Sequence, residues 1–523
     1  MNGIFSLLAC VGLMTILGAC ANIQGISGGP EDNEPPQWVT EGSTPAYQLN
    51  FNARTITLHF SEWIKLDNPS TQIFISPTTL YPLKSKLKGK SLIVELDDRD
   101  SLRPNTTYTL QFGKSIKDIT KGNVLENFKY VFSTGDFLDS LKIQGRVIDA
   151  FTQNPKKQTV VSLYKNLEDS AFKKTKPDYY TITDESGNFK MDYLSPGCYK
   201  LYALEDKNQN YYYDQQSEDI GFLQNCVDLI TFSSGNELIL QTASQRFPLQ
   251  TRETNKQPGF TYLRLNRSAK ESIRWIEQDT GMYYLESADS AVVWNPYPVE
   301  KIAVWKAENK LDTVIVKPAV DLHPDSSFRM KVVRSSFPAG DALILQAAFP
   351  IRSMDSSGFY LIDSSARFTQ IRRDSSDPRR LRLTGNWRPG TQQTLICQKG
   401  ALLNCFHQNN ALDSLRFQIP LENSYASLVV QVDSFSFNQI LLQLILNDAL
   451  MVERKAMISP TERTFRFTHL IPGNYKLRIV SDLNQNQHWD TSDFDTKQPA
   501  EPVYYYTLPE LRADWEVKAN IKY

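Results

Sequence analysis

Residues 102–123 read LRPNTTYTLQFGKSIKDITKGN, and this stretch decides the class of fold. Within it, TTYTLQFG alternates apolar with polar side chains, and clusters of Pro, Asn, Asp and Gly bound it on both sides. An alternation with a period of two places every second side chain on one face of a β-strand. The pattern continues outward in RTITLHFSEWIKL (54–66), SLIVELDD (91–98) and NFKYVFSTG (127–135). Short strands separated by turn residues at this spacing indicate a β-sandwich.

Composition extends this prediction to the whole chain. No long segment has an apolar stripe with the helical period, so we expect an all-β protein with few and short helices. A chain of 523 residues is too long for one hydrophobic core, which predicts several domains in a string. Basic and acidic residues number 57 and 58, for a net charge of −1. No concentrated positive face is therefore expected, and nucleic acid is excluded as a partner.

Residues 37–136 resemble the bacterial Ig-like domain of S-layer type. In that family, Leu-x-Pro-x-Thr-x-Tyr leads into a strand, an Asp followed by Gly-Asn makes a turn, and a Phe-x-Thr-Gly strand ends the sandwich. The residues of this chain in those places are Pro104, Tyr108, Asp118, Gly122, Asn123, Phe132, Thr134 and Gly135.

A second type of sandwich follows, and both types recur. Residues 137–243 look like the transthyretin-like domain that is related to carboxypeptidase regulatory domains. LSPGCYKL (194–201) returns as LIPGNYKL (470–477), and LRPNTTYTL (102–110) pairs with WRPGTQQTL (387–395). We therefore expect a duplicated Ig-like plus transthyretin-like pair. The remaining predicted domains are an unassigned β-rich module at 244–330, a divergent Ig-like domain at 331–420 and a second transthyretin-like domain at 421–523.

The N-terminus predicts a lipoprotein signal peptide over residues 1–19. Its apolar run from Ile4 to Leu17 is too short to span a bilayer. The run ends in LGAC (17–20), which resembles the lipobox cut by bacterial lipoprotein signal peptidase. The resemblance implies acyl chains such as palmitate on Cys20, and residues 20–36, rich in Gly, Pro and acids, then form a flexible lipidated tether. The alternative is an ordinary secretory peptide or a weak membrane anchor.

Two polar loops follow strand-like runs, in LYALEDKNQNYYYD (201–214) and LRIVSDLNQNQHWD (477–490). An Asp-x-Asn-x-Asn alternation points three side-chain oxygens inward, and calcium takes six to eight such oxygens. Both loops lack the glycine of calcium loops at the sixth position, and the alternative is a turn whose Asn and Asp side chains bond their own backbone. Calcium is the one cofactor that the sequence indicates. Its candidate ligands are Asp206, Asn208, Asn210 and Asp214 in the first loop and Asp482, Asn484, Asn486, Asp490 and Asp493 in the second.

Four cysteines remain after the signal peptide and Cys20. In an oxidising compartment, local pairing joins Cys198 to Cys226 and Cys397 to Cys405, which is one of three connectivities. Free, buried thiols are the alternative.

Six Asp-Ser/Thr-aliphatic triplets resemble the O-glycosylation sequon of Bacteroidota. The alternative is that Asp-Ser is common turn chemistry. The implied modification sites are Ser101, Ser140, Ser170, Ser290, Thr313 and Ser414.

The sequence shows no motif that carries catalysis. The five histidines are scattered, and no HExxH segment, GxSxG nucleophile elbow after a strand, P-loop or GxGxxG after a strand occurs. We therefore expect a protein that is not an enzyme.

From the lipobox through GGPEDNEPP (28–36) to YKLRIVSDLNQNQHWD (475–490), the chain resembles a family of Bacteroidota Ig-like-domain outer-membrane lipoproteins. The acidic residues of 31–34 are similar to the export signals of surface lipoproteins, which implies anchoring in the outer membrane on its extracellular side. The family resemblance implies a scaffold or accessory subunit of an outer-membrane assembly or secretion complex, with β-barrel or machinery proteins as partners. The alternative is an adhesin or glycan-capture lipoprotein that uses the exposed aromatics Tyr211, Tyr212 and Tyr213.

Overall fold

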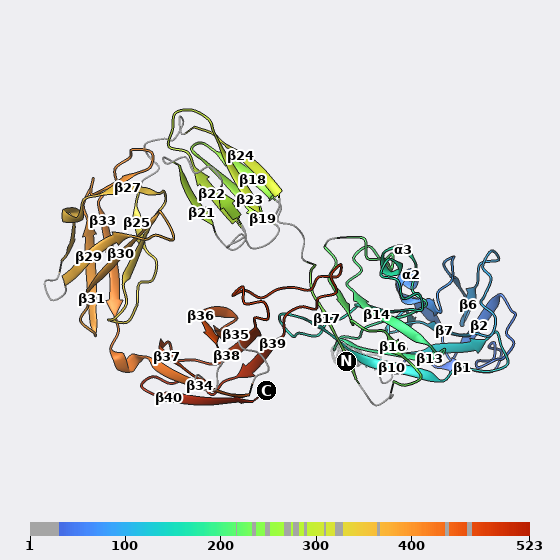
Figure 1. Ribbon diagram of the computed structural model, residues 1–523. Coiled ribbons are helices and arrows are strands. Elements are labelled where there is room, and N and C mark those ends of the chain that lie inside the picture. The colour runs from blue at the N-terminus through green and yellow to red at the C-terminus, as the bar shows by residue number, and fades with distance from the viewer. Residues whose placement is uncertain are drawn as a thin grey trace, which may run out of the picture. The chain divides into compact units, whose positions relative to one another are not determined.

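Figure 1 shows the protein as a computed structural model. Two compact units divide the described residues. The first unit comprises residues 31–147, 157–214 and 225–240, and the second comprises 148–156, 215–224 and the described residues from 241 onward. The described residues are 31–215, 217–232, 237–245, 251–265, 273–275, 282–286, 290–307, 310–318, 328–362, 367–434, 439–457 and 463–522.

The first Ig-like sandwich has two antiparallel sheets with the strand orders β1-β2-β6-β5 and β4-β7-β9, and a two-stranded ribbon β3-β8. One helical turn, α2 (Pro69–Gln72), lies between β3 and β4. The strands are β1 (Trp38–Val39), β2 (Thr55–Phe60), β3 (Ile64–Leu66), β4 (Phe74–Ser76), β5 (Lys84–Lys88), β6 (Ser91–Glu95), β7 (Thr107–Gln111), β8 (Ile116–Asp118) and β9 (Lys129–Ser133).

The central strand β7 shows why the Ig-like motif carries a tyrosine. Tyr108 is buried, and its ring stacks on Phe132 with the ring centroids 5.4 Å apart. Its hydroxyl accepts a hydrogen bond from the backbone N–H of Arg103 at 2.7 Å. One side chain therefore fills the core and also fixes the turn that leads into its own strand. This placement explains both the tyrosine of the motif and its buried position in the alternating strand.

The first transthyretin-like sandwich packs the sheet β13-β10-β17 against β12-β11-β14-β15, and β16 also pairs with β14. Its core includes Phe172, from the helical turn α3 (Ala171–Lys174), which stacks on Tyr202 at 4.3 Å. The strands are β10 (Leu141–Asp149), β11 (Val160–Tyr164), β12 (Tyr179–Ile182), β13 (Asn188–Leu194), β14 (Cys198–Leu204), β15 (Ile220–Phe222), β16 (Val227–Asp228) and β17 (Leu238–Thr242).

The middle module, which the sequence left unassigned, is also built from two sheets. Their orders are β18-β19-β22-β21 and β20-β23-β24. Leu263, Val293 and Val314 are among the residues of its buried core. The strands are β18 (Thr251–Gln257), β19 (Phe260–Leu265), β20 (Ile273–Trp275), β21 (Tyr283–Glu286), β22 (Ser290–Trp294), β23 (Lys301–Ala307) and β24 (Lys310–Val316).

The second Ig-like sandwich has the sheets β25-β26-β30-β29 and β28-β31-β33 and the ribbon β27-β32. A single 3-10 turn, η1 (Ser356–Gly358), precedes β28. The strands are β25 (Met330–Val332), β26 (Leu343–Ala347), β27 (Ile351–Met354), β28 (Phe359–Leu361), β29 (Arg367–Arg373), β30 (Arg380–Asn386), β31 (Thr391–Cys397), β32 (Leu402–Asn404) and β33 (Asp413–Ile419).

The second transthyretin-like sandwich follows the 3-10 turn η2 (Glu422–Ser424). Its sheets are β37-β34-β40, in which β34 and β40 run parallel, and β36-β35-β38-β39. The strands are β34 (Ala426–Ser434), β35 (Gln439–Leu446), β36 (Ala449–Met457), β37 (Thr464–Leu470), β38 (Tyr475–Ser481), β39 (Val503–Thr507) and β40 (Glu516–Lys522).

Strand order confirms the predicted duplication. Each sheet of the first Ig-like sandwich has a counterpart in the second, strand for strand, from β1 matching β25 to β9 matching β33. The sheets β13-β10-β17 and β12-β11-β14-β15 match β37-β34-β40 and β36-β35-β38-β39 in the same way. The chain is therefore an all-β string of sandwiches in which one pair is used twice. Each strand of one copy except β16 has a counterpart in the other, so the matched strands make each copy a control for its partner.

Candidate functional site

The two polar loops adopt the same internally bonded conformation. In the first, the Asp206 carboxylate accepts from the backbone N–H groups of Asn210 and Tyr211, at 3.2 and 2.7 Å. In the second, Asp482 accepts from Asn486 and Gln487, at 3.0 and 2.7 Å. The loops thus satisfy their own backbone, as in the turn interpretation.

A second carboxylate closes each loop from the far end. Asp214 accepts from the side-chain amides of Asn208 and Asn210, at 3.1 and 2.7 Å. Asp490 accepts in the same way from Asn484 and Asn486, both at 2.5 Å. The structure therefore brings together four of the predicted residues in each loop. A cation there would take the amide oxygens in place of the amide N–H groups, which requires a flip of each amide plane.

Asp493 does not join this set. Its carboxylate accepts from the backbone N–H groups of Asp495 and Thr496, at 2.9 and 3.2 Å, and caps the following turn. The second loop is closed by Glu501, which the sequence analysis missed. Its two oxygens accept from the N–H groups of Leu483 and Asp490, at 2.7 and 3.0 Å.

Glu501 is 4% exposed, and its burial raises the pKa of its carboxyl to about 7, even though its two backbone hydrogen bonds act in the opposite direction. The negative charges of Asp490 and Asp482 also contribute to this raised pKa. The acid that closes the second loop therefore titrates near neutral pH.

A cluster of three carboxylates lies at one end of the ribbon β3-β8. One oxygen each from Asp32, Glu62 and Asp118 lies within 4.8 Å of the other two. Asp118 accepts from the N–H groups of Lys121, Gly122 and Asn123, at 2.6, 2.9 and 2.8 Å. Burial raises the pKa of Glu62, and the charges of Asp32 and Asp118 raise it further.

The second Ig-like copy shows that the fold does not require these acids. Phe349 stands two residues before β27, where Glu62 stands two residues before β3. Asn404 replaces Asp118 at the end of the ribbon, and its oxygen accepts from the N–H groups of Phe406 and Gln408, both at 2.9 Å. The turn is retained in the second copy without the charge.

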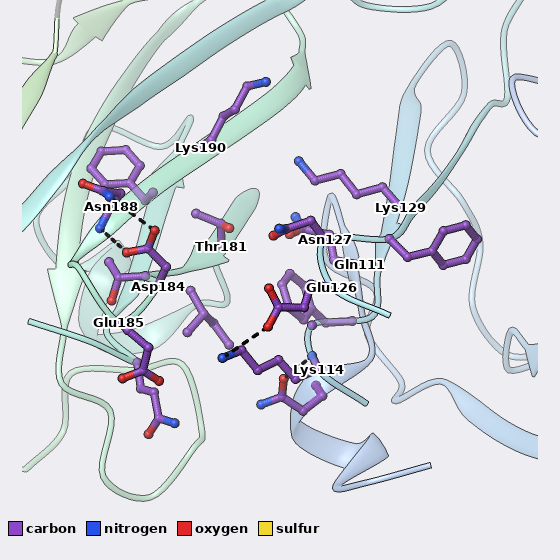
Figure 2. A pocket seen from close by; sticks show the side chains of 18 of the residues that line it. Gln111, Lys114, Glu126, Asn127, Lys129, Thr181, Asp184, Glu185, Asn188 and Lys190 are labelled. Carbon is purple, nitrogen blue, oxygen red and sulfur yellow. Dashed lines mark hydrogen bonds and ion pairs between the residues drawn. The ribbon is translucent and has the colours of Figure 1, made fainter. Parts of the chain in front are cut away.

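A cleft of about 1100 Å³ opens inside the first unit, between residues of the Ig-like and transthyretin-like sandwiches (Figure 2). Phe74 stacks on Tyr180 at 4.5 Å, and Arg103 pairs with Asp178 at 2.6 Å, so both walls are held together. Side-chain amides are prominent in the lining, at Asn68, Gln72, Gln111, Asn127, Gln144, Gln158 and Asn188.

Several charged groups of the cleft are engaged with neighbours. Lys114 pairs with Glu126 at 3.7 Å, and the Asp184 carboxylate accepts from the N–H groups of Ser186 and Asn188, at 2.9 and 2.8 Å (Figure 2). The amides and the hydroxyl of Thr181 both donate and accept hydrogen bonds. The cleft therefore suits a polar, uncharged ligand better than an ion.

The three tyrosines proposed as a binding platform are part of the packing. Tyr213 is buried and stacks on Phe172 at 5.8 Å. Tyr211 packs against Tyr180 at 4.7 Å, and Tyr211 and Tyr212 are half-buried. They do not form an exposed aromatic surface.

One of the two expected disulfides is present. Cys198 and Cys226 are bonded, with their Cα atoms 5.7 Å apart. Cys397 and Cys405 are free, buried thiols, so the second pairing is wrong. Cys397 ends β31, whereas Cys405 follows β32, and these strands belong to different sheets. Burial raises the pKa of both thiols, which makes them inert structural residues.

The expected glycosylation sites differ in exposure. Ser101, Ser140 and Ser414 are exposed, and Ser170 is half-buried. Ser290 is 7% exposed and is poorly accessible to an enzyme in the folded chain. Thr313 lies in β24. Cys20 and the signal peptide lie outside the described residues. None of the described helices is long and apolar enough to cross a membrane.

Comparison with known proteins agrees with the fold of the first domain. Residues 32–134 match the family model of the bacterial Ig-like domain. No curated protein matches the chain. The surface layer protein SbsC, domains 1-6, is 10% identical with a TM-score of 0.17, and the match covers 88% of this chain and 66% of that chain.

BcpA, the major pilin subunit of Bacillus cereus, is 11% identical with a TM-score of 0.14, covering 73% of this chain and 99% of that one. The Bacillus anthracis TIE protein is 9% identical with a TM-score of 0.14, covering 95% and 76%. At this level of similarity these structures carry no argument about function. The secure result is that the chain contains a bacterial Ig-like domain at residues 32–134.

Proposed function

We propose that the protein is a non-enzymatic, lipid-anchored component of the bacterial cell envelope that works by presenting surfaces. It acts as a scaffold or accessory subunit of an outer-membrane assembly or secretion complex, on the extracellular side. The observation that carries the proposal is the duplicated pair of sandwiches with one strand order. A repeated module spaces contact surfaces along a chain, which is what a scaffold requires.

The lipobox supports the anchoring part of this proposal. Acyl chains on Cys20 give stable membrane attachment, because two chains bind far more tightly than one. The resemblance to Bacteroidota surface lipoproteins supports the choice of membrane and of side. The interaction of each sandwich with its partners is then spread over sheet faces and loops, without a short list of catalytic residues.

Affinity purification of the full-length, tagged protein from detergent-solubilised membranes tests the proposal. The expected result is stoichiometric recovery of an outer-membrane protein, identified by mass spectrometry, that is lost in a Cys20→Ser variant. An untagged strain is the control for background. Recovery of the lipoprotein alone, under conditions that keep other membrane complexes intact, contradicts the scaffold role.

A second candidate function is glycan capture, and the amide-lined cleft favours it. Amide and hydroxyl groups match the hydrogen-bonding pattern of sugar hydroxyls, which are neutral donors and acceptors. Gln144 and Gln158 line the cleft and are exposed. Binding on a glycan array that falls on Gln144→Ala and Gln158→Ala supports capture.

The exposed Gln370 of the second Ig-like copy provides the matched control, because Gln370→Ala leaves the cleft unchanged. Growth of a deletion strain separates the two functions. A defect on one polysaccharide favours capture, and a general envelope defect favours the scaffold.

A further inference from the structure

Two large apolar side chains stand exposed beside each other at one end of the ribbon β3-β8. Trp63 immediately precedes β3, and Ile119 immediately follows β8. The backbone N–H of Ile119 donates to the carbonyl of Trp63 at 3.2 Å, so the two residues extend the ladder of the ribbon. Their exposed fractions are 59% for Trp63 and 53% for Ile119.

The second Ig-like copy closes the same position. There the N–H of Cys405 donates to the carbonyl of Pro350 at 2.9 Å, which is the equivalent ladder contact. Pro350 and Cys405 are both buried. The fold can therefore be completed with both of these positions buried, and the first copy departs from that arrangement.

The N-terminal segment is bound at this same end of the ribbon. Lys121, two residues after Ile119, pairs with Glu31 at 3.2 Å. The side-chain amide of Asn123 donates to the carbonyls of Asp32 and Glu34, at 3.0 and 3.2 Å. The chain therefore leaves the described structure next to the exposed pair.

Chain length then limits how far this end of the ribbon lies from the lipid. Cys20 precedes Glu31 by eleven residues. A segment of that length spans at most about 40 Å when fully extended, and about 20 Å as a flexible coil. If Cys20 carries acyl chains, as the proposed function requires, Trp63 and Ile119 are held within that distance of the bilayer.

We propose that Trp63 and Ile119 form a membrane-contact surface that docks the first Ig-like domain onto the lipid headgroup region. Tryptophan favours this region because its ring is apolar and its indole N–H is polar. Ile119 adds apolar area that enters the boundary between headgroups and acyl chains. Charged groups of both signs flank the pair, namely the carboxylates of Glu62 and Asp118 and the ammonium of Lys121, so the surface fits a zwitterionic lipid bilayer.

Docking converts a flexible attachment into a defined one. The acyl chains alone hold the protein at the membrane but leave its first domain free to move on the tether. A second, weaker contact beside the tether acts at high effective concentration, because the anchor already confines it near the surface. The first Ig-like domain would then have a fixed orientation relative to the membrane.

Fluorescence of the full-length, lipidated protein in phosphatidylcholine vesicles tests this inference. The Trp63 component is obtained as the difference between wild type and Trp63→Phe. Trp515 is the matched control, because its exposed fraction is 61% and it lies in the second transthyretin-like sandwich. Nitroxide-labelled lipids should quench the Trp63 component by about twofold or more and leave the Trp515 component unchanged.

A second variant separates docking from a change in the tryptophan itself. Ile119→Ser should reduce the lipid quenching of Trp63 while the melting temperature stays the same, because Ile119 is exposed. Mass spectrometry of the N-terminal peptide establishes whether Cys20 is acylated. An unmodified Cys20 overturns both the proposed anchoring and this inference.

If aqueous acrylamide quenches Trp63 of the acylated protein as strongly with vesicles as without them, that result overturns the membrane contact of Trp63 and Ile119 and leaves the proposed anchoring intact. A Trp63 signal that depends on protein concentration and not on lipid assigns the surface to a second copy, and also overturns it.

Discussion

Removing the disulfide between Cys198 and Cys226 should destabilise the first transthyretin-like sandwich by several kcal/mol. The bond joins residues 28 positions apart and encloses the whole first polar loop. Opening a cross-link of this span returns about 12 cal/mol/K to the unfolded chain, or about 3.5 kcal/mol at about 25 °C. The second sandwich has Asn474 where the first has Cys198, so it serves as an internal reference.

Urea unfolding followed by hydrogen exchange and mass spectrometry reads each sandwich through its own peptides. With a denaturant dependence of about 1 to 3 kcal/mol per M, the midpoint for peptides of 141–204 should fall by about 1 to 3 M in Cys198→Ser/Cys226→Ser. Peptides of 426–481 should not change, and the wild type in reductant should reproduce the shift. A shift below about 0.5 M, or an equal fall in both sandwiches, would show that the disulfide does not stabilise this sandwich through the entropy of its unfolded chain.

Four further outcomes follow from the contacts described. Calcium should raise the melting temperature of the second transthyretin-like sandwich, and Asp482→Ala should weaken that rise. An equal melting temperature in EDTA and in millimolar calcium would show that the loop does not bind calcium. Because the pKa of Glu501 is raised, its protonation stabilises the folded state fully below about pH 4.5, and this stabilisation is lost as the pH rises through about 7. In EDTA, the free energy of unfolding of the same sandwich should therefore fall by about 3 kcal/mol across that range, and that of Glu501→Gln should not. Parallel pH profiles of the two proteins would contradict this. Tyr108→Phe leaves the N–H of Arg103 without its acceptor and should cost the first Ig-like sandwich about 1 to 3 kcal/mol in chemical denaturation, and no change would mean that water replaces the hydroxyl. Asp118→Asn should keep the turn folded, because an asparagine makes it in the second copy; rapid amide exchange at Gly122 in the variant would show otherwise.

Local pattern was enough to predict the strands. TTYTLQFG became β7 (Thr107–Gln111) and NFKYVFSTG became β9 (Lys129–Ser133), because alternation is a property of neighbouring residues and needs no long-range information. The duplication was also readable, since two copies of one fold retain the same turns at the same spacing. The middle module also consists of strands with an alternating pattern, although no family resemblance pointed to its fold.

Contacts between distant residues were out of reach. Glu62 stands two residues before β3 and Asp118 ends β8, and these strands pair only in the folded ribbon, so no spacing in the sequence predicts their cluster with Asp32. Glu501 closes the second loop from beyond its end for the same reason. Cys397 and Cys405 show the opposite error, because closeness in sequence suggested a bond, whereas both are free, buried thiols in the structure.

The parallel pairing of β34 with β40 gives the second transthyretin-like sandwich a mechanical property. The first and last strands of this domain lie side by side in seven register pairs, from Ser427 with Glu516 to Ser434 with Lys522. Tension applied across the domain, at the start of β34 and the end of β40, would pull the strands along their length in opposite directions. Their hydrogen bonds would then be loaded in shear and would have to break together, whereas a hairpin pulled open at one end would unzip bond by bond. We therefore expect this sandwich to resist unfolding when tension is applied between these two strand ends.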